Sequence, residues 1–300
     1  MKSNPHLFRL NAMNTRSTAL LASMILLWSQ LPSSAITQVR ANSTDNIDSS
    51  TPEQVASFGS VSDAEDGTFV SGMSNGFASA SFGVLRAFGQ AATAARTDSF
   101  GYSVFSSNTA TWRDDFLFSS AALNGTAGSV QVRFTIDGNL AMTPSGVPDG
   151  SDFYNFTTYS QIGFTFLTAD GQGIGNKWER LYANGTSASN QGLFLGIEQV
   201  ATLNFIYGTP LTDVRLDLQA VVNATGSNKG WTSSGVANAA NTATWGGFGT
   251  VLDAGGNPVT NYTFSSGSGT NFAQAIPEPG TVTLVAAAGL LAALARRRRR

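Results

Sequence analysis

The residues with the clearest chemical meaning lie near the C-terminus, in the strip Pro277-Glu278-Pro279. Proline fixes φ and lacks a backbone N–H, so the two prolines keep Glu278 extended and outside helix or sheet. An extended strip is what a processing enzyme can grip. The 15 residues 281–295 that follow carry no charge. The sequence then closes on five arginines, Arg296, Arg297, Arg298, Arg299 and Arg300.

The apolar run 281–295 is shorter than the roughly 20 residues that a stable membrane span needs. Its length therefore favours a temporary stop at the membrane over a permanent anchor. The five arginines stay on the cytoplasmic side by the positive-inside rule. We expect a short hydrophobic helix as a transmembrane segment over 281–295, with the basic tail 296–300 setting its orientation.

The order of these features over 276–300 resembles the PEP-CTERM sorting signal. The resemblance implies that an exosortase, a membrane-embedded cysteine protease, cuts near the motif and delivers the protein to the cell surface. The family belongs to Gram-negative bacteria that make exopolysaccharide, which implies an exopolysaccharide or biofilm context. A short membrane anchor with a chance Pro-Glu-Pro strip is the alternative interpretation.

The N-terminal end has the layout of a secretory signal peptide. Arg9 and Arg16 precede an apolar stretch, and small residues follow it up to Ala35. We predict a signal peptide over 1–35, starting at the first methionine or at Met13, with signal peptidase as a partner during export. A short buried helix is the alternative interpretation.

The chain that remains after removal of both ends is acidic. Three of the 17 basic residues leave with the signal and five with the tail, so nine remain, against 18 of the 19 acidic residues. The formal net charge of the exported chain is therefore −9. Such a surface repels nucleic acid and anionic lipid headgroups, so neither is an expected partner of the exported chain.

The composition excludes several kinds of catalysis. The chain has no cysteine, and its one histidine, His6, lies in or before the signal peptide. Thiolate chemistry, Ser-His-Asp catalysis and ordinary zinc sites are thereby removed from the exported chain. A glycoside hydrolase needs only two carboxylates, but no motif singles out such a pair. We therefore expect no enzyme and no obligatory cofactor.

Two weak ligand patterns remain. Asp149 and Asp152, with Asp137 nearby in sequence, offer oxygen ligands of the kind calcium prefers, whereas Asp beside Gly is equally typical of turns. An aromatic face suits the apolar face of a sugar ring, and tryptophan is also a common core residue. Trp231, in a polar loop, is the preferred sugar-binding candidate. The exported tryptophans are Trp112, Trp178, Trp231 and Trp245.

Alternating apolar and polar residues predict strands in several parts of the chain. The clearest examples are 130–137, 162–166, 203–207 and 214–222. The stretch 36–66 is polar and predicts a flexible lead. Asp114 and Asp115 are adjacent strand residues, which point to opposite faces, so we expect one of them to be solvated.

Many short strands without intervening helices predict one all-β domain over 67–273, an antiparallel β-sandwich of jelly-roll type. A solenoid is the disfavoured alternative, because no internal repeat is found. We expect an exported, exosortase-sorted surface or extracellular-matrix protein, structural or adhesive in an exopolysaccharide coat. Its route passes through the inner membrane. The alternatives are a calcium-dependent carbohydrate-binding module and, less favoured, a secreted carboxylate-dependent glycoside hydrolase.

Overall fold

The computed structural model describes residues 38–45, 54–56, 60–69, 72–94, 102–145, 158–182, 187–189, 194–226 and 232–277. All of them belong to one compact unit, Ala35–Arg300. Within these ranges the chain forms strands and turns and no helix. The predicted signal peptide 1–35 and the apolar segment 281–295 lie outside the described residues.

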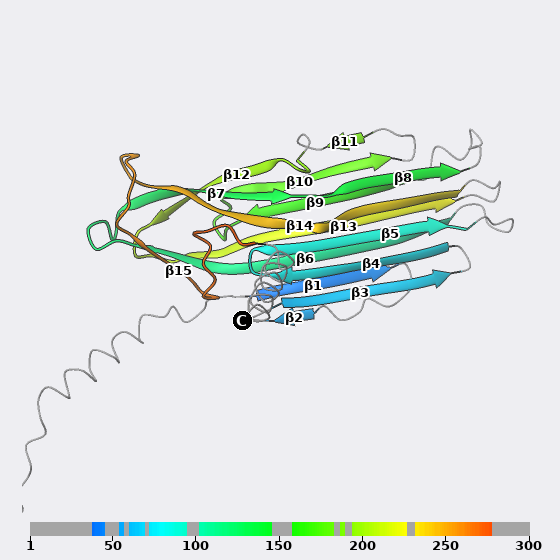
Figure 1. The fold of residues 1–300 in the computed structure, drawn as a ribbon, viewed down its shortest axis with the longest axis horizontal. Helices are drawn as coiled ribbons and strands as arrows, with labels where there is room; N and C mark the ends of the chain where they lie inside the picture. The colour runs from blue at the N-terminus through cyan, green and yellow to red at the C-terminus, as the bar shows by residue number, and fades with distance from the viewer. Residues whose placement is uncertain are drawn as a thin grey trace, which may run out of the picture. The chain divides into compact units, whose positions relative to one another are not determined.

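The described strands form two antiparallel sheets (Figure 1). Sheet A has the order β11-β10-β9-β13-β6-β1-β2, with β15 also paired to β6. Sheet B has the order β12-β7-β14-β5-β4-β3, with β8 also paired to β14. The bounds are β1 Gln38–Asp45, β2 Gln54–Ala56, β3 Ser60–Phe69, β4 Gly72–Ser81, β5 Val84–Thr93, β6 Tyr102–Ser119, β7 Ala127–Ile136, β8 Asn139–Ser145, β9 Tyr159–Leu167, β10 Gly173–Tyr182, β11 Ser187–Ser189, β12 Glu198–Ile206, β13 Leu211–Gly226, β14 Thr232–Asp253 and β15 Thr263–Ser266.

The predicted all-β sandwich is confirmed, and each of the four alternating stretches is a strand. In β7, Val130, Val132 and Phe134 are buried while the residues between them are half-buried or exposed. The same alternation holds in β9, β12 and β13. One face of each strand thus enters the space between the sheets, because a strand places successive side chains on opposite faces.

An aromatic cluster joins the two sheets. The rings of Trp112 in β6 and Trp245 in β14 lie 5.7 Å apart in an edge-on arrangement. Phe134 in β7 lies 5.3 Å from Phe166 in β9. Trp112 and Trp245 are almost completely buried, 0% and 1% exposed. Both tryptophans are therefore core residues, and neither offers its ring to a sugar.

Small residues and a buried amide fill another part of the space between the sheets. Asn108 in β6 is fully buried, and its Nδ2 donates to Ser106 Oγ at 2.9 Å. A Cβ at Gly76 would come within 2.3 Å of that Nδ2. Glycine at position 76 therefore makes room for the amide. Alanines 78, 80, 87 and 91 in the same region of sheet B are also fully buried.

The flexible lead predicted over 36–66 contains strands wherever the structure describes it. The β1 strand pairs with β6 over its whole length, Gln38–Asp45, and β3 pairs with β4. These strands lie at or near sheet edges, where backbone hydrogen bonds hold a strand that carries few apolar side chains. Within the described ranges, paired strands are thus present from Gln38 on, upstream of residue 67. Composition missed them because it reports side-chain burial and not backbone pairing.

The expectation that one of Asp114 and Asp115 is solvated is wrong, because both are buried, with 0% and 6% exposure. Their side chains do point to opposite faces of the strand, but each carboxylate accepts a hydrogen bond from the backbone and can therefore be buried. Asp114 Oδ1 accepts from the backbone N–H of Asp115 at 2.8 Å and of Ser268 at 3.0 Å. Asp115 Oδ1 accepts from the N–H of Asp213 at 2.9 Å. Buried polar groups are normally satisfied in this way.

The two environments of tryptophan lead to a stability prediction. Trp245→Ala is expected to lower the free energy of unfolding by about 3–5 kcal/mol, because it leaves a large cavity in the core. Trp178→Ala is the matched control, because it removes a half-buried ring from the outer face of sheet A. It should lower the free energy of unfolding by about 1 kcal/mol. Urea unfolding followed by circular dichroism measures both. Equal losses would contradict the assignment of Trp245 to the core.

Candidate functional site

The end of the described chain is fastened to the core just before the Pro-Glu-Pro strip. Phe272 is fully buried, with its ring centroid 5.1 Å from that of Trp112 and 5.4 Å from that of Trp245. Trp245 Nε1 donates a hydrogen bond to the Phe272 carbonyl at 2.7 Å. The Ile276 N–H in turn donates to the Trp245 carbonyl at 2.9 Å. The segment 272–276 is thus held by both ring contacts and backbone bonds.

Among the described residues, Ile276 is the last one held in this way. Its side chain covers Gly83, where φ is +78° and a Cβ would come within 2.2 Å of Ile276 Cδ1. Only glycine suits both the backbone conformation and the close approach. Pro277, the next residue, is exposed. The packed part of the described chain therefore ends just before the first proline of the predicted processing strip.

The other predicted sorting residues, Glu278, Pro279 and the arginines 296–300, lie outside the described residues. In the described part of the chain, no helix has the length and apolar character to cross a membrane.

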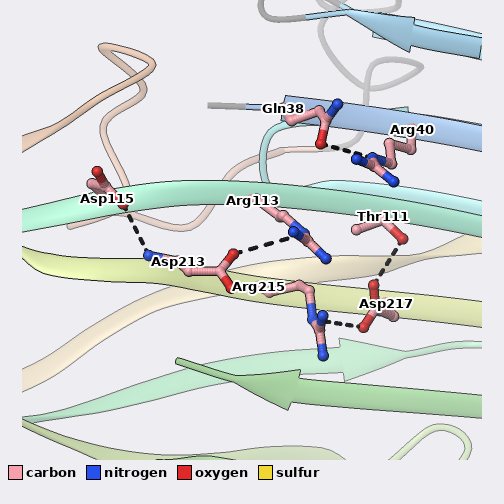
Figure 2. A network of polar contacts seen from close by, with 8 residues as sticks. All are labelled: Gln38, Arg40, Thr111, Arg113, Asp115, Asp213, Arg215 and Asp217. Atoms are coloured by element: carbon pink, nitrogen blue, oxygen red, sulfur yellow. Dashed lines mark hydrogen bonds and ion pairs between the residues drawn. The ribbon is translucent and has the colours of Figure 1, made fainter. Parts of the chain in front are cut away.

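A polar network occupies the outer face of sheet A (Figure 2). Arg113 and Thr111 come from β6, and Asp213, Arg215 and Asp217 from β13. Arg215 Nε lies 3.0 Å from Asp217 Oδ2, and Arg113 Nε lies 3.7 Å from Asp213 Oδ1. Thr111 Oγ1 donates to Asp217 Oδ1 at 2.8 Å. On the neighbouring β1, Arg40 Nε donates to Gln38 Oε1 at 2.7 Å. The network thus connects β6 to β13 across their pairing.

Asp115 joins this network through the backbone of Asp213. That residue has a φ of +52°, at the irregularity between Leu211 and Val214 in the pairing of β13 with β6. Aspartate tolerates the left-handed region better than most residues. The bend lets the Asp213 N–H reach Asp115 Oδ1. Asp115 Oδ2 is buried and accepts no hydrogen bond from the described residues.

Burial controls the electrostatics of these acids. Desolvation raises the pKa of Asp115 above the ordinary 3.8, and the hydrogen bond from the Asp213 N–H opposes it. Desolvation also raises the pKa of Asp217, against the Thr111 hydrogen bond and the Arg215 charge. Raised carboxyl pKa values occur at catalytic sites and equally in structural networks. Here the acids lie beside donors on paired strands, so the arrangement suits holding β13 in register on β6.

The calcium candidates are not brought together in the described part of the chain. Asp137 is exposed just after β7, and Asp149 and Asp152 lie outside the described residues. Among the residues that can be described, no three His, Cys, Asp or Glu side chains are grouped as a metal site requires. The calcium site therefore stays a prediction.

The preferred sugar-binding tryptophan, Trp231, also lies outside the described residues. Trp178 in β10 is half-buried on the outer face of sheet A, beside Arg180. Trp178 is one of the four tryptophans of the predicted exported chain, but its surroundings cannot be predicted from the sequence. The available signal was the alternation of Trp178, Arg180 and Tyr182 along one strand, which places three large side chains on one face.

The raised pKa of Asp115 leads to a pH prediction. Its folded-state value lies above 3.8, so the native protein holds this proton more tightly than the unfolded chain does. The resulting stability is fully present below pH 3.8 and is lost as the pH rises to the raised value. Asp115→Asn keeps a side-chain oxygen that can accept the Asp213 N–H, but it cannot ionise. It is therefore expected to reduce the loss of stability as the pH rises.

Thermal unfolding from about pH 3.5 to 7, the window in which carboxyl linkage acts, measures the effect. The exposed Asp137→Asn variant is the control. Parallel Tm profiles for wild type, control and Asp115→Asn would contradict the prediction.

Comparisons with known proteins concern mainly the C-terminal end. A family model described as the PEP-CTERM protein-sorting motif matches residues 275–300. No curated protein matches the chain. One similar solved structure is the enzymatically active domain of tailspike protein 4 of bacteriophage CBA120, at 10% identity and a TM-score of 0.14, and the match covers 61% of this chain and 19% of that one. The chain therefore carries the PEP-CTERM protein-sorting motif at residues 275–300, as its C-terminal sequence predicted.

Proposed function

We propose that this chain is an exosortase-processed surface or extracellular-matrix protein with a structural or adhesive role in a polysaccharide coat. The PEP-CTERM motif supports export and sorting. The observation that carries the proposal is the position of the strip, which follows directly on Ile276, the last of the described residues that packs on the sandwich.

The spacing between the sandwich and the membrane segment supports this role for the strip. Four residues, 277–280, separate Ile276 from the apolar run at 281–295. Fully extended, they span about 14 Å at most. Before processing, the folded sandwich would thus be held close to the membrane, with the strip between them within reach of a membrane-embedded protease.

A cut in this strip would leave the fold intact. Phe272 and Ile276 lie on the N-terminal side of the strip and keep their contacts with Trp245. The core requires no disulfide, since the chain has no cysteine. A released sandwich would therefore remain stable outside the cell, which is what a structural or adhesive matrix component needs.

Variants of the strip test the processing step. In the producing organism, the pair of substitutions Pro277→Ala and Glu278→Gln is expected to block processing, so that full-length chain accumulates in membranes. Gln274→Ala is the matched control, because Gln274 is exposed and only two residues separate it from the strip. The control should be processed like wild type. Intact mass of the protein from membranes, cell surface and medium measures all three.

A wild-type protein that ends near the strip would support the proposal, and added mass at that end would reveal an attachment. A wild-type chain that keeps its five C-terminal arginines and stays in the membrane fraction would overturn it. Processing of the strip variant at the wild-type rate would show that Pro277 and Glu278 are not read.

A further inference from the structure

A cluster of aromatic rings around one arginine occupies the outer face of β9 and β10. The guanidinium carbon of Arg180 lies 4.1 Å from the ring centroid of Tyr159, 4.6 Å from that of Trp178 and 5.7 Å from that of Tyr182. All four side chains are half-buried. Glu179, between Trp178 and Arg180, points inward and accepts the N–H of Phe194 at 2.8 Å and of Leu195 at 2.7 Å.

The arginine is held in place by neutral groups in the part of the chain that the structure describes. Arg180 Nε donates to Gln161 Oε1 at 2.8 Å, Nη2 donates to the same oxygen, and Nη1 donates to the Tyr182 hydroxyl at 3.3 Å. A guanidinium has five N–H donors, so two are left for a ligand. Within the described ranges, no carboxylate forms an ion pair with Arg180.

A hollow lies beside the cluster on the same face. Trp178 is directly opposite Gly163 in β9, Gly163 is opposite Gln219 in β13, and Gln219 is opposite Thr109 in β6. Because Gly163 has no side chain, the outer surface of sheet A is hollowed between Trp178 and Gln219. The hollow measures about 280 Å³, near the lower end, about 300 Å³, of small-molecule sites. Its lining is Thr109, Gly163, Phe164, Thr165, Asn176, Asp217 and Gln219.

We propose that this surface, Tyr159, Trp178, Arg180, Tyr182 and the adjoining hollow, binds a pyranose polysaccharide. A pyranose ring has an apolar face that stacks on an aromatic ring, and hydroxyl groups on its rim. Trp178 supplies the ring, and the amide and carboxylate groups of Asn176, Gln219 and Asp217 supply hydrogen-bond partners. An open sheet face accepts the interior of a long chain as well as its end.

The positive charge of Arg180, beside neutral neighbours, favours chains that contain uronic acid. Four of the nine basic residues of the exported chain lie on the outer face of sheet A: Arg40, Arg113, Arg180 and Arg215. Arg113 and Arg215 have acidic neighbours at 3.7 Å and 3.0 Å, whereas Arg180 has neutral ones. A uronate carboxylate would find its partner at the two remaining donors of Arg180, since charge-assisted bonds to arginine are strong.

This inference rests on the proposed adhesive role and identifies a binding site for it. Native affinity electrophoresis of the full chain in mild detergent, in gels that contain a neutral β-glucan, a galactomannan or polygalacturonate, measures binding. Trp178→Ala is expected to weaken retention about five- to tenfold. Phe88→Ala is the matched control, because Phe88 is a half-buried ring stacked 5.8 Å from Phe77 on the outer face of sheet B.

A second variant keeps the test decisive if Trp178→Ala is unstable. Gly163→Val fills the hollow from its floor, and a Cβ there meets its nearest neighbour, the Lys177 carbonyl, at 3.3 Å. Valine favours a strand, so the fold should persist while retention falls. Arg180→Gln should weaken retention by polygalacturonate only.

Retention of wild type and Phe88→Ala, with loss in Trp178→Ala or Gly163→Val, would support the site. No retention in any gel, or equal retention of all variants, would overturn it. Intact mass of the same variants from the producing organism separates the two proposals. Normal processing without glycan binding would contradict the proposed binding site alone. Failed processing of the wild type would contradict the proposed function.

Discussion

The packing of Trp245 between the two sheets is the interaction on which the rest of the structure depends. Its ring contacts Trp112 from the opposite sheet at 5.7 Å and Phe272 from the C-terminal segment at 5.4 Å. Its indole N–H and its backbone carbonyl each hold that segment, at Phe272 and Ile276. One residue thus links sheet B, sheet A and the end of the domain, and burial of such large rings dominates core energetics.

This arrangement connects the core with sorting. The PEP-CTERM motif at residues 275–300 begins within the segment that Trp245 holds, and among the described residues the exposed Pro277 directly follows the packed Ile276. In the proposed function, a cut within the strip would lie after Ile276, so the domain would lose none of the core residues that the structure describes. The core that stabilises the sandwich would then also mark the boundary of the part of the chain that such a cut leaves behind.

The outer face of sheet A follows a different constraint. Strand pairing places Trp178, Gly163, Gln219 and Thr109 in one row, and the core imposes nothing on their outward side chains. The polar network of Arg113, Asp213 and its neighbours secures β13 on β6. The neighbouring strands β9 and β10 carry the arginine and its rings. Alternation along β10 places Trp178, Arg180 and Tyr182 on one face, and strand register adds the row from Gly163 to Thr109 to the same surface.

The sequence alone determined the sorting motif, because proline geometry, an uncharged run and an arginine cluster act locally and in order. It also determined the four alternating strands, whose period reports which face is buried. Only the tertiary structure decided that 36–66 contains paired strands, that Asp114 and Asp115 are both buried, and that Trp112 and Trp245 belong to the core while Trp178 does not. The physical reason is that these outcomes depend on partners far away in the chain: a backbone edge in β6, the N–H of Asp213 and Ser268, and the facing sheet. Composition and spacing contain no record of such partners.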